Sequence, residues 1–337
     1  MSDFYDNGSH NKTGLFVRIP VIDKSNYKNA FEITFSMNKG TFFGDVREEL
    51  KDSNYREVAK RFEDFINAKK MDKENRIFKS DSYVAKIYYP KKHMYYDNEL
   101  KVYNSLLDKD YLSKLYFNGE INNFKYIVME RLNGISLFDT WRNLTLSERE
   151  NSIKQIALIL KDINNIVTQK KDFKQEFIIN FNKNLQLLKD EYLKKYFKEI
   201  FDELIKYLND IEQCYLIHID THFYNFFYND KKIYGYDFEN LTMAPLDYNL
   251  IRWYRMWQHP DDFYYPKNSL SAKDIDSYGG IMEILLDNYE EITKIDNLDL
   301  RVKLYELYYL MLETNRCNFD KDIVKRYVNN ARKVKIY

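Results

Sequence analysis

The order in which strand-like and helix-like segments follow one another constrains the fold of this chain most. In the first 131 residues, short runs rich in Val, Ile, Phe and Tyr alternate with helix-like segments, whereas the remainder reads mostly as helix. The exception in the second part is a strand-rich stretch, Tyr215 to Phe238. We therefore expect an α+β chain with two lobes, a β-rich one at residues 1–131 and a mainly helical one at residues 132–337.

Local patterns predict the individual elements. The predicted strands are Gly14–Val21, Ala30–Ser36, Arg76–Phe78, Tyr83–Tyr89 and Tyr126–Glu130. The predicted helices are Arg47–Lys69, Asn98–Leu107, Ser147–Val167, Phe181–Tyr196, Phe197–Leu208 and Arg301–Arg316. Ser147 is the expected N-cap of its helix, with Glu150 completing a capping box.

Composition excludes several functional classes. With 45% hydrophobic and 31% charged residues, the 337-residue chain has the composition of a folded protein. Lys+Arg and Asp+Glu both number 52, so no overall basic field draws the chain to nucleic acid. A polar N-terminus and the lack of any run of about 18 apolar residues predict a cytoplasmic protein without membrane insertion. Cys214 and Cys317 lie far apart, which favours buried thiols over a disulfide or a zinc site.

The strand-rich stretch carries the residues for a reaction. Its loop contains Asp220 and Asn225, a turn is expected at Asn229–Lys232, and Asp237 follows twelve residues after Asn225. Phosphoryl transfer needs a carboxylate that accepts the proton of the attacking hydroxyl, together with oxygen ligands for Mg²⁺. We therefore predict Asp220 as catalytic base and Asn225 and Asp237 as magnesium ligands.

These residues resemble the motifs of a known superfamily. The pattern H-x-D-x-x-x-x-N, starting at His218 and followed by Asp237-Phe238-Glu239, resembles the catalytic loop and metal motif of the protein-kinase-like superfamily. His222, two residues after Asp220, and Glu239 narrow the resemblance to the aminoglycoside phosphotransferase and choline kinase branch. The resemblance implies a bilobal kinase-like fold and the use of ATP and Mg²⁺. His222 either orients the loop, lines the acceptor site or is a structural histidine.

The resemblance extends to the first lobe, which it assigns to nucleotide binding behind an N-terminal extension. Tyr83–Lys86 resembles the strand whose lysine contacts the nucleotide phosphates, and Glu99 is placed to pair with Lys86. Backbone groups near Arg131 and Leu132 are then expected to meet the nucleotide base.

Further segments resemble the family less closely. Asp247 occupies the place of an acid that braces the catalytic loop through its backbone N–H groups, and it also suits an N-cap. No glycine-rich phosphate lid precedes Lys86, so either the Asp72–Asn75 turn or the segment Asn38–Gly44 would cover the phosphates. The short interval from Asp237 to Asp247 disfavours a protein kinase with a long regulated loop.

The expected acceptor wall follows the metal motif. Trp253 and Trp257 lie four residues apart on one helix face, with Asp261 and Asp262 close by in sequence. Such aromatic rings either hold a quaternary amine by cation–π contact, stack a sugar, or pack the helix in the core.

Together these features predict an ATP- and Mg²⁺-dependent phosphotransferase acting on a hydroxyl of a small molecule. The acceptor classes are an amino alcohol, an aminoglycoside, a sugar or a glycan precursor. The alternatives are a kinase acting on protein and an inactive pseudokinase that serves as a binding module. The identity of the acceptor and the oligomeric state stay open.

Overall fold

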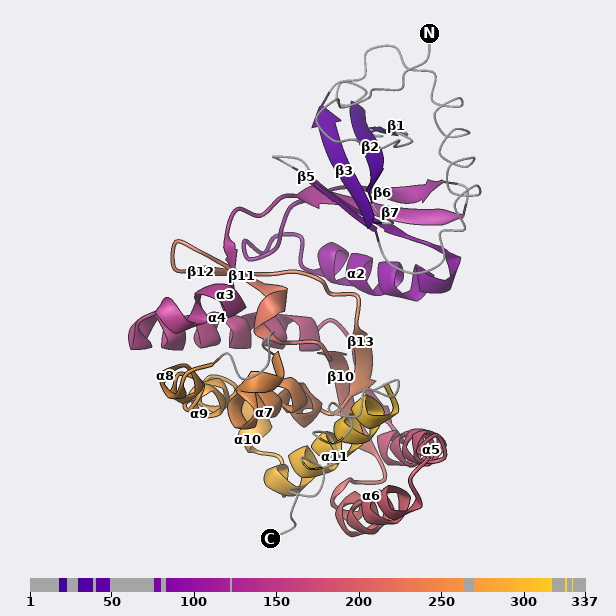
Figure 1. The fold of residues 1–337 in the computed structure, drawn as a ribbon, viewed down its shortest axis with the longest axis vertical. Helices are drawn as coiled ribbons and strands as arrows, with labels where there is room; N and C mark the ends of the chain where they lie inside the picture. Colours follow the sequence, from indigo (N-terminus) through magenta and orange to yellow (C-terminus); the bar gives the residue numbers. More distant parts are fainter. Residues whose placement is uncertain are drawn as a thin grey trace. The chain divides into compact units, whose positions relative to one another are not determined.

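The chain folds into two compact units (Figure 1). A computed structural model describes residues 18–22, 30–38, 41–48, 76–79, 83–121, 123–263 and 270–316, with residues 325 and 329. Unit one comprises Met1–Gly134 and Tyr236–Glu239, and unit two comprises Ile135–Gly235 and Asn240–Tyr337. The segment Tyr236–Glu239, which the sequence analysis placed in the second lobe, is therefore part of unit one.

Unit one contains two antiparallel sheets. The first has the order β1-β2-β3 and is built from β1 (Arg18–Ile22), β2 (Ala30–Asn38) and β3 (Thr41–Glu48). The second has the order β4-β5-β7-β6, from β4 (Arg76–Lys79), β5 (Tyr83–Tyr88), β7 (Phe124–Glu130) and β6 (Leu115–Ile121). The strand β5 is central, with Lys86 opposite Ile127 of β7, and its residues from Ala85 onward are buried.

Helix α2 (His93–Ser105) covers the second sheet of unit one (Figure 1). It follows a 3-10 turn that starts at Pro90, a residue whose fixed φ suits a first helical position. The buried residues of α2 are Tyr96, Glu99, Val102 and Tyr103, three or four positions apart on one face. Helical periodicity thus places a glutamate, Glu99, on the buried face among apolar neighbours.

Unit two is mainly helical, with two small sheets. Its helices are α3 (Leu137–Thr140), α4 (Leu146–Asn164), α5 (Phe173–Leu185), α6 (Glu191–Leu204), α7 (Leu250–Gln258), α8 (Ala272–Asp276), α9 (Ile281–Asp287), α10 (Glu290–Thr293) and α11 (Leu298–Arg316). One sheet has the order β13-β10-β9, from β13 (Leu241–Ala244), β10 (Glu212–His218) and β9 (Thr168–Lys171). The other has the order β12-β11-β8, from β12 (Lys232–Gly235), β11 (Phe226–Asn229) and β8 (Ile135–Ser136).

The turn between β11 and β12 is the one predicted at Asn229–Lys232. Asp230 and Lys231 both have positive φ, of 47° and 65°, as a two-residue hairpin of this type requires. Aspartate tolerates this left-handed region better than most residues.

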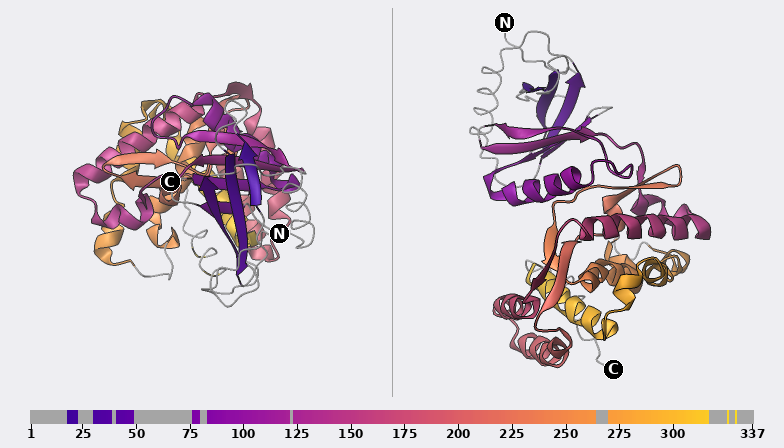
Figure 2. Two further views of the ribbon diagram at one scale, coloured as in Figure 1. Left: turned by 90° about the horizontal axis from the view of Figure 1, so that it is seen from above. Right: turned by 180° about the vertical axis from the view of Figure 1, so that it is seen from behind.

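The core of unit two is rich in aromatic rings. Helices α5 and α6 lie beside α11, as the right-hand view of Figure 2 shows. Phe181 of α5 stacks on Phe201 of α6 with ring centroids 3.7 Å apart, and both rings are buried. The cluster extends to Leu304 and Leu307 of α11 and to Ile217 of β10, so it anchors the strand that leads into the loop containing Asp220 and Asn225.

Several predicted element boundaries were wrong. The helix predicted at Phe181–Tyr196 is interrupted: α5 ends at Leu185, and Asp190 starts α6 by accepting a hydrogen bond from the Leu193 N–H. The capping box of α4 uses Thr145 and Glu148, two residues before the predicted pair.

The remaining differences concern unit one and the ends of the chain. Residues 47 and 48, predicted as the start of a helix, belong to β3, and the rest of that predicted helix lies outside the described residues. The Asp72–Asn75 turn and Cys317 also lie outside them. Within the described ranges, no helix has both the length and the apolar character needed to cross a bilayer.

Candidate active site

Lys86 is the centre of a charged cluster in unit one. Its Nζ lies 2.8 Å from Glu99 Oε2, 2.5 Å from Asp237 Oδ1 and 3.9 Å from Glu239 Oε2. The predicted pair of Lys86 and Glu99 is therefore present. Residues from a strand, a helix and a distant loop meet at one ammonium group.

The charges in this cluster favour a protonated Lys86. Burial opposes the charge, but the carboxylates of Glu99 and Asp237 outweigh it and raise the pKa of Lys86 above its usual value. Burial, followed by the Asp237 carboxylate, raises the pKa of Glu239 to about 7. Lys86 is thus a fixed positive charge among three acids.

Glu99 is held by two partners at the same carboxylate oxygen. The hydroxyl of Tyr88, also on β5, donates a hydrogen bond to Glu99 Oε2, the atom that pairs with Lys86. The other oxygen, Oε1, is buried and has no hydrogen-bond partner among the described residues. Glu99, Asp237 and Glu239 each offer an oxygen within 4.8 Å of the others, a donor set that suits a hard cation such as Mg²⁺.

The segment that carries Asp237 is tied to unit one by contacts with helix α2. Asn98 of α2 donates a hydrogen bond to the Glu239 carbonyl at 2.8 Å, and the Phe238 ring meets Tyr103 edge-on at 6.1 Å. Asp237 itself has a φ of 63°, an uncommon conformation for a non-glycine residue. Backbone strain of this kind persists only where surrounding contacts impose it, and it is frequent at functional sites.

The loop predicted to be catalytic, in unit two, starts where β10 ends. The Ile219 N–H donates to the Asn240 carbonyl at 3.0 Å, and the Asp220 N–H donates to His218 Nδ1 at 3.1 Å. Asn225 Nδ2 donates to the Asp220 carbonyl at 2.7 Å. Because the nitrogen of the Asn225 amide is engaged in this bond, its oxygen is the atom available to a metal ion.

The Asp220 carboxylate has two cationic or potentially cationic partners. Its Oδ1 lies 3.0 Å from Arg252 Nη2 and 3.3 Å from His222 Nε2. Burial opposes ionisation, but His222 and Arg252 outweigh it and hold the pKa of Asp220 well below its usual value. Asp220 is therefore a carboxylate at neutral pH, in a fixed orientation.

His222 also contacts aromatic rings. Its ring lies 5.9 Å from Tyr224 and 6.2 Å from Phe263, measured between centroids. Of the alternatives raised by the sequence, the contact with Asp220 supports a part in orienting the loop.

Sequence reasoning missed Arg252. It lies on α7, one residue before Trp253, and no motif spacing distinguishes it from other arginines. Only the tertiary structure identifies Arg252, because the packing of α7 brings the Arg252 guanidinium to Asp220 and the Ile219 carbonyl.

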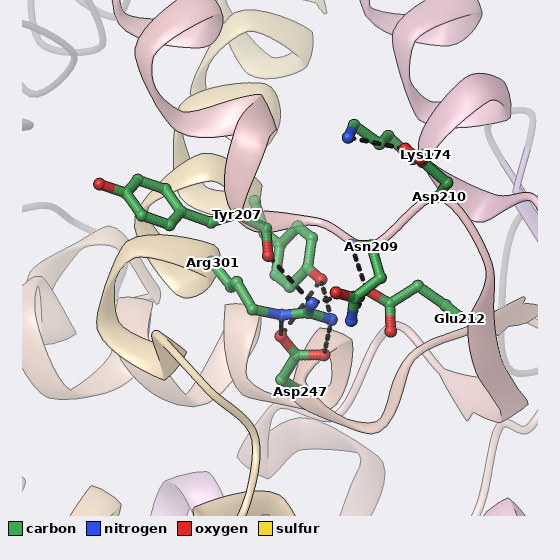
Figure 3. A network of polar contacts seen from close by, with 8 residues as sticks. Lys174, Tyr207, Asn209, Asp210, Glu212, Asp247 and Arg301 are labelled. Atoms are coloured by element: carbon green, nitrogen blue, oxygen red, sulfur yellow. Dashed lines mark hydrogen bonds and ion pairs between the residues drawn. The ribbon is translucent and has the colours of Figure 1, made fainter.

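Asp247 differs from its prediction. Its carboxylate accepts from Arg301 of α11, with Nε to Oδ2 at 2.5 Å and Nη2 to Oδ1 at 3.1 Å, and from the Tyr305 hydroxyl at 3.2 Å (Figure 3). Arg301 also reaches Glu212 on β10 at 2.6 Å. Asp247 thus ties α11 to β10 through Arg301 rather than bracing the loop through backbone N–H groups.

The two predicted acceptor tryptophans lie in different environments. Trp253 is fully buried and meets Phe223 edge-on at 5.7 Å, so its ring packs α7 in the core and is not free to contact a ligand. Trp257 is 38% exposed and contacts Tyr254 at 5.8 Å.

The segment predicted to meet the nucleotide base directly follows β7. Arg131 is exposed and Leu132 is half-buried, after the strand ends at Glu130. Their contact with a base stays a prediction.

Residues 67–279 match a protein family described as the phosphotransferase enzyme family. This match covers the charged cluster and the catalytic loop together. No curated protein matches the sequence.

Solved structures share the fold. The gentamicin–APH(2″)-IIa complex has a TM-score of 0.55 at 13% identity, over 85% of this chain and 98% of that chain. Amicoumacin kinase hAmiN, in complex with AMP-PNP, Ca²⁺ and Ami, has a TM-score of 0.55 at 14% identity, over 83% and 96% of the two chains. A choline/ethanolamine kinase family protein from Mesorhizobium loti has a TM-score of 0.53 at 10% identity, over 77% and 84%. The predicted α+β, kinase-like fold is confirmed.

Proposed function

Because this chain belongs to the phosphotransferase enzyme family, we propose that it moves the γ-phosphate of ATP, with Mg²⁺, to a hydroxyl of a small molecule. The acceptor classes are those expected from the sequence: an amino alcohol, an aminoglycoside, a sugar or a glycan precursor. One structure with a similar fold is a complex with gentamicin, and another is amicoumacin kinase in complex with Ami. Both support a small molecule as the acceptor.

One observation carries the proposal most strongly. Lys86, Glu99 and Asp237 come from three separate segments, yet they meet with Lys86 Nζ within 2.8 Å of a carboxylate oxygen of each acid. A lysine held by one buried acid beside a metal-binding acid is the arrangement that phosphoryl transfer uses to bind the nucleotide phosphates.

The roles of the residues follow from their chemistry. Lys86 binds phosphate oxygens, and Glu99 holds the Lys86 side chain in place. Asp237 and Asn225 would hold the metal ion, which would neutralise charge on the phosphates. The acid-rich donor set around Asp237 fits such an ion.

In the transfer step, Asp220 accepts the proton that the acceptor hydroxyl loses. The acceptor oxygen forms a bond to the γ-phosphorus while the bond from that phosphorus to the bridging oxygen breaks, and ADP leaves with the electron pair. The hydroxyl proton passes to the Asp220 carboxylate. Because the pKa of Asp220 is held low, Asp220 acts mainly by orienting the hydroxyl and takes the proton late in the step.

Two rivals make different predictions. A kinase acting on protein would label Ser, Thr or Tyr, and a pseudokinase would bind nucleotide without turnover. The ten-residue interval between Asp237 and Asp247 is short for a regulated peptide-binding loop, which supports a small acceptor. The intact Asp220, Asn225 and Asp237 support turnover.

The test is ATP consumption by wild type and Asp220→Ala across amines, sugars and generic proteins. We expect turnover with a small acceptor that Asp220→Ala lowers by at least about a hundredfold, a typical contribution of a positioned base. Equal thermal stability and equal Mg²⁺–nucleotide binding by the variant would exclude misfolding. Turnover that does not depend on Asp220, or phosphate found only on protein, would refute the proposal.

A further inference from the structure

Arg252 is the cation closest to the catalytic base, and it is held on three sides. Its Nη2 lies 3.0 Å from Asp220 Oδ1, its Nη1 donates to the Tyr309 hydroxyl at 2.6 Å, and its Nε donates to the Ile219 carbonyl at 3.4 Å. The side chain is 19% exposed. A planar guanidinium with three fixed donors keeps its charge in one place.

The aromatic face beside this arginine is already occupied by cations. The Tyr309 ring has Arg252 Cζ at 4.7 Å and Arg255 Cζ at 5.5 Å from its centroid. Both distances are within the range of a cation–π contact. The Tyr309 ring therefore already makes cation–π contacts with two of the protein's own arginines.

Three acids near this face are already paired with arginines. Asp262, which the sequence suggested as an attractor for an amine, pairs with Arg255. Glu306 pairs with the same arginine at 3.3 Å, and Glu313 pairs with Arg316 at 2.6 Å. Asp220 itself pairs with Arg252 at 3.0 Å. These paired carboxylates offer little net negative charge to a cationic acceptor.

We propose, on the premise of the function above, that Arg252 determines acceptor specificity by excluding compounds with a positive charge beside the reacting hydroxyl. The acceptor is then a neutral or anionic polyhydroxyl compound of the sugar type. A hydroxyl hydrogen-bonded to Asp220 Oδ1 lies at most about 6 Å from Arg252 Nη2, and one hydrogen-bonded to Oδ2 lies at most about 8 Å away, distances at which like charges still repel in a partly buried site.

The experiment compares acceptors that differ in charge on one ring: D-glucose, D-glucosamine and D-glucuronate, with the same comparison for galactose and its amino and acid analogues. Phosphate transfer from ATP is followed below pH 7, where the amines are protonated, and Asp220→Asn is the blank. We expect kcat/KM for the neutral or acid sugar to exceed that for the amino sugar by about tenfold or more. A wild type that prefers the amino sugars overturns the inference.

Two variants of Arg252 isolate the charge. Arg252→Gln removes it, and Arg252→Lys keeps it. We expect Arg252→Gln to raise the ratio of amino sugar to neutral sugar kcat/KM by about tenfold, and Arg252→Lys to leave that ratio near its wild-type value. A merely structural arginine would change both acceptors equally, so an unchanged ratio in Arg252→Gln also overturns the inference.

A measurement on the wild type alone covers the case in which Arg252→Gln does not fold. Raising the ionic strength from about 0.01 M to 1 M shortens the Debye length from about 30 Å to 3 Å, and it should reduce discrimination against the amino sugar. Discrimination that is independent of salt counts against the charge of Arg252. Failure of the proposed function is distinct, because wild type would then match Asp220→Asn with every acceptor.

Discussion

Lys86 Nζ lies 2.5 Å from Asp237 Oδ1, although the two residues are 151 positions apart in the chain. The contact joins a central strand of unit one to the segment Tyr236–Glu239, which returns to unit one after a hundred residues of unit two. It forms because Lys86 is buried with Glu99 as its first partner and with the acids of the returning segment as its others. Binding of nucleotide phosphates would replace Asp237 as a partner of the same ammonium group.

Replacing Lys86 should destabilise unit one as well as abolish nucleotide binding. Lys86→Met leaves the buried carboxylate of Glu99 without its counter-charge, and breaking a buried ion pair from one side costs about 3–5 kcal/mol. Urea unfolding followed by circular dichroism measures this loss, with exposed Lys91→Met as the matched control. Equal stability of the two variants would show that the pair contributes little.

The Tyr88 hydroxyl should contribute to stability through Glu99. Tyr88→Phe keeps the ring and removes one hydrogen bond to a buried carboxylate, which is worth about 1.5–3 kcal/mol. Thermal and urea unfolding of Tyr88→Phe, compared with Tyr95→Phe on the partly exposed side of α2, measures the difference. A loss no larger than that of the control contradicts the role given to this hydroxyl.

Arg301 should be essential for the folding of unit two and not for chemistry. Arg301→Met leaves the buried carboxylates of Asp247 and Glu212 without their counter-charge, and we expect a loss of about 3–5 kcal/mol in unfolding free energy. The KM for ATP should stay close to wild type in the folded fraction at low temperature. Lys198→Met, in an exposed pair with Asp202, is the control and should change stability little. A large change in KM without a loss of stability would instead place Arg301 in the active site.

Cys214 should react slowly with thiol reagents in the folded protein. Burial raises the pKa of the Cys214 thiol to about 11, so at pH 8 only about one thiol in a thousand is the reactive thiolate. In a Cys317→Ser background, alkylation at pH 8 should be slow until denaturant is added. Rapid alkylation of the native variant would mean that the strand β10 opens readily.

Thr145, not Ser147, should cap α4. Thr145→Ala removes the side-chain acceptor of the Glu148 N–H and should cost about 1 kcal/mol, whereas Ser147→Ala should cost much less. Parallel urea titrations of the two variants decide between the two caps, because both residues are exposed and small.

Local signals were sufficient for some of these features. Asp220, Asn225 and Asp237 were predicted from their short, fixed separations in a loop and strand context, and their roles stay a prediction. The pairing of Lys86 with Glu99 was predicted because a strand pattern containing the lysine is followed by a helix pattern containing the glutamate. Neither residue type is distinctive by itself. In contrast, the helix break after Leu185 was missed, since apolar residues continue at helical spacing through it and only Asp190 marks the new start.

The sequence by itself determined the α+β class, the phosphotransferase motifs and the pairing of Lys86 with Glu99, because each depends on residues whose spacing is set by one element or loop. Only the tertiary structure decided that Arg252 neutralises Asp220, that Asp247 binds Arg301, and that Trp253 is buried while Trp257 is exposed. These contacts join helices α7 and α11 to other elements, so they depend on packing rather than on spacing. The stretch Tyr215–Phe238 thus carries the residues that the sequence predicts for the reaction, and Arg252 of helix α7 helps to set the charge state of one of them, Asp220.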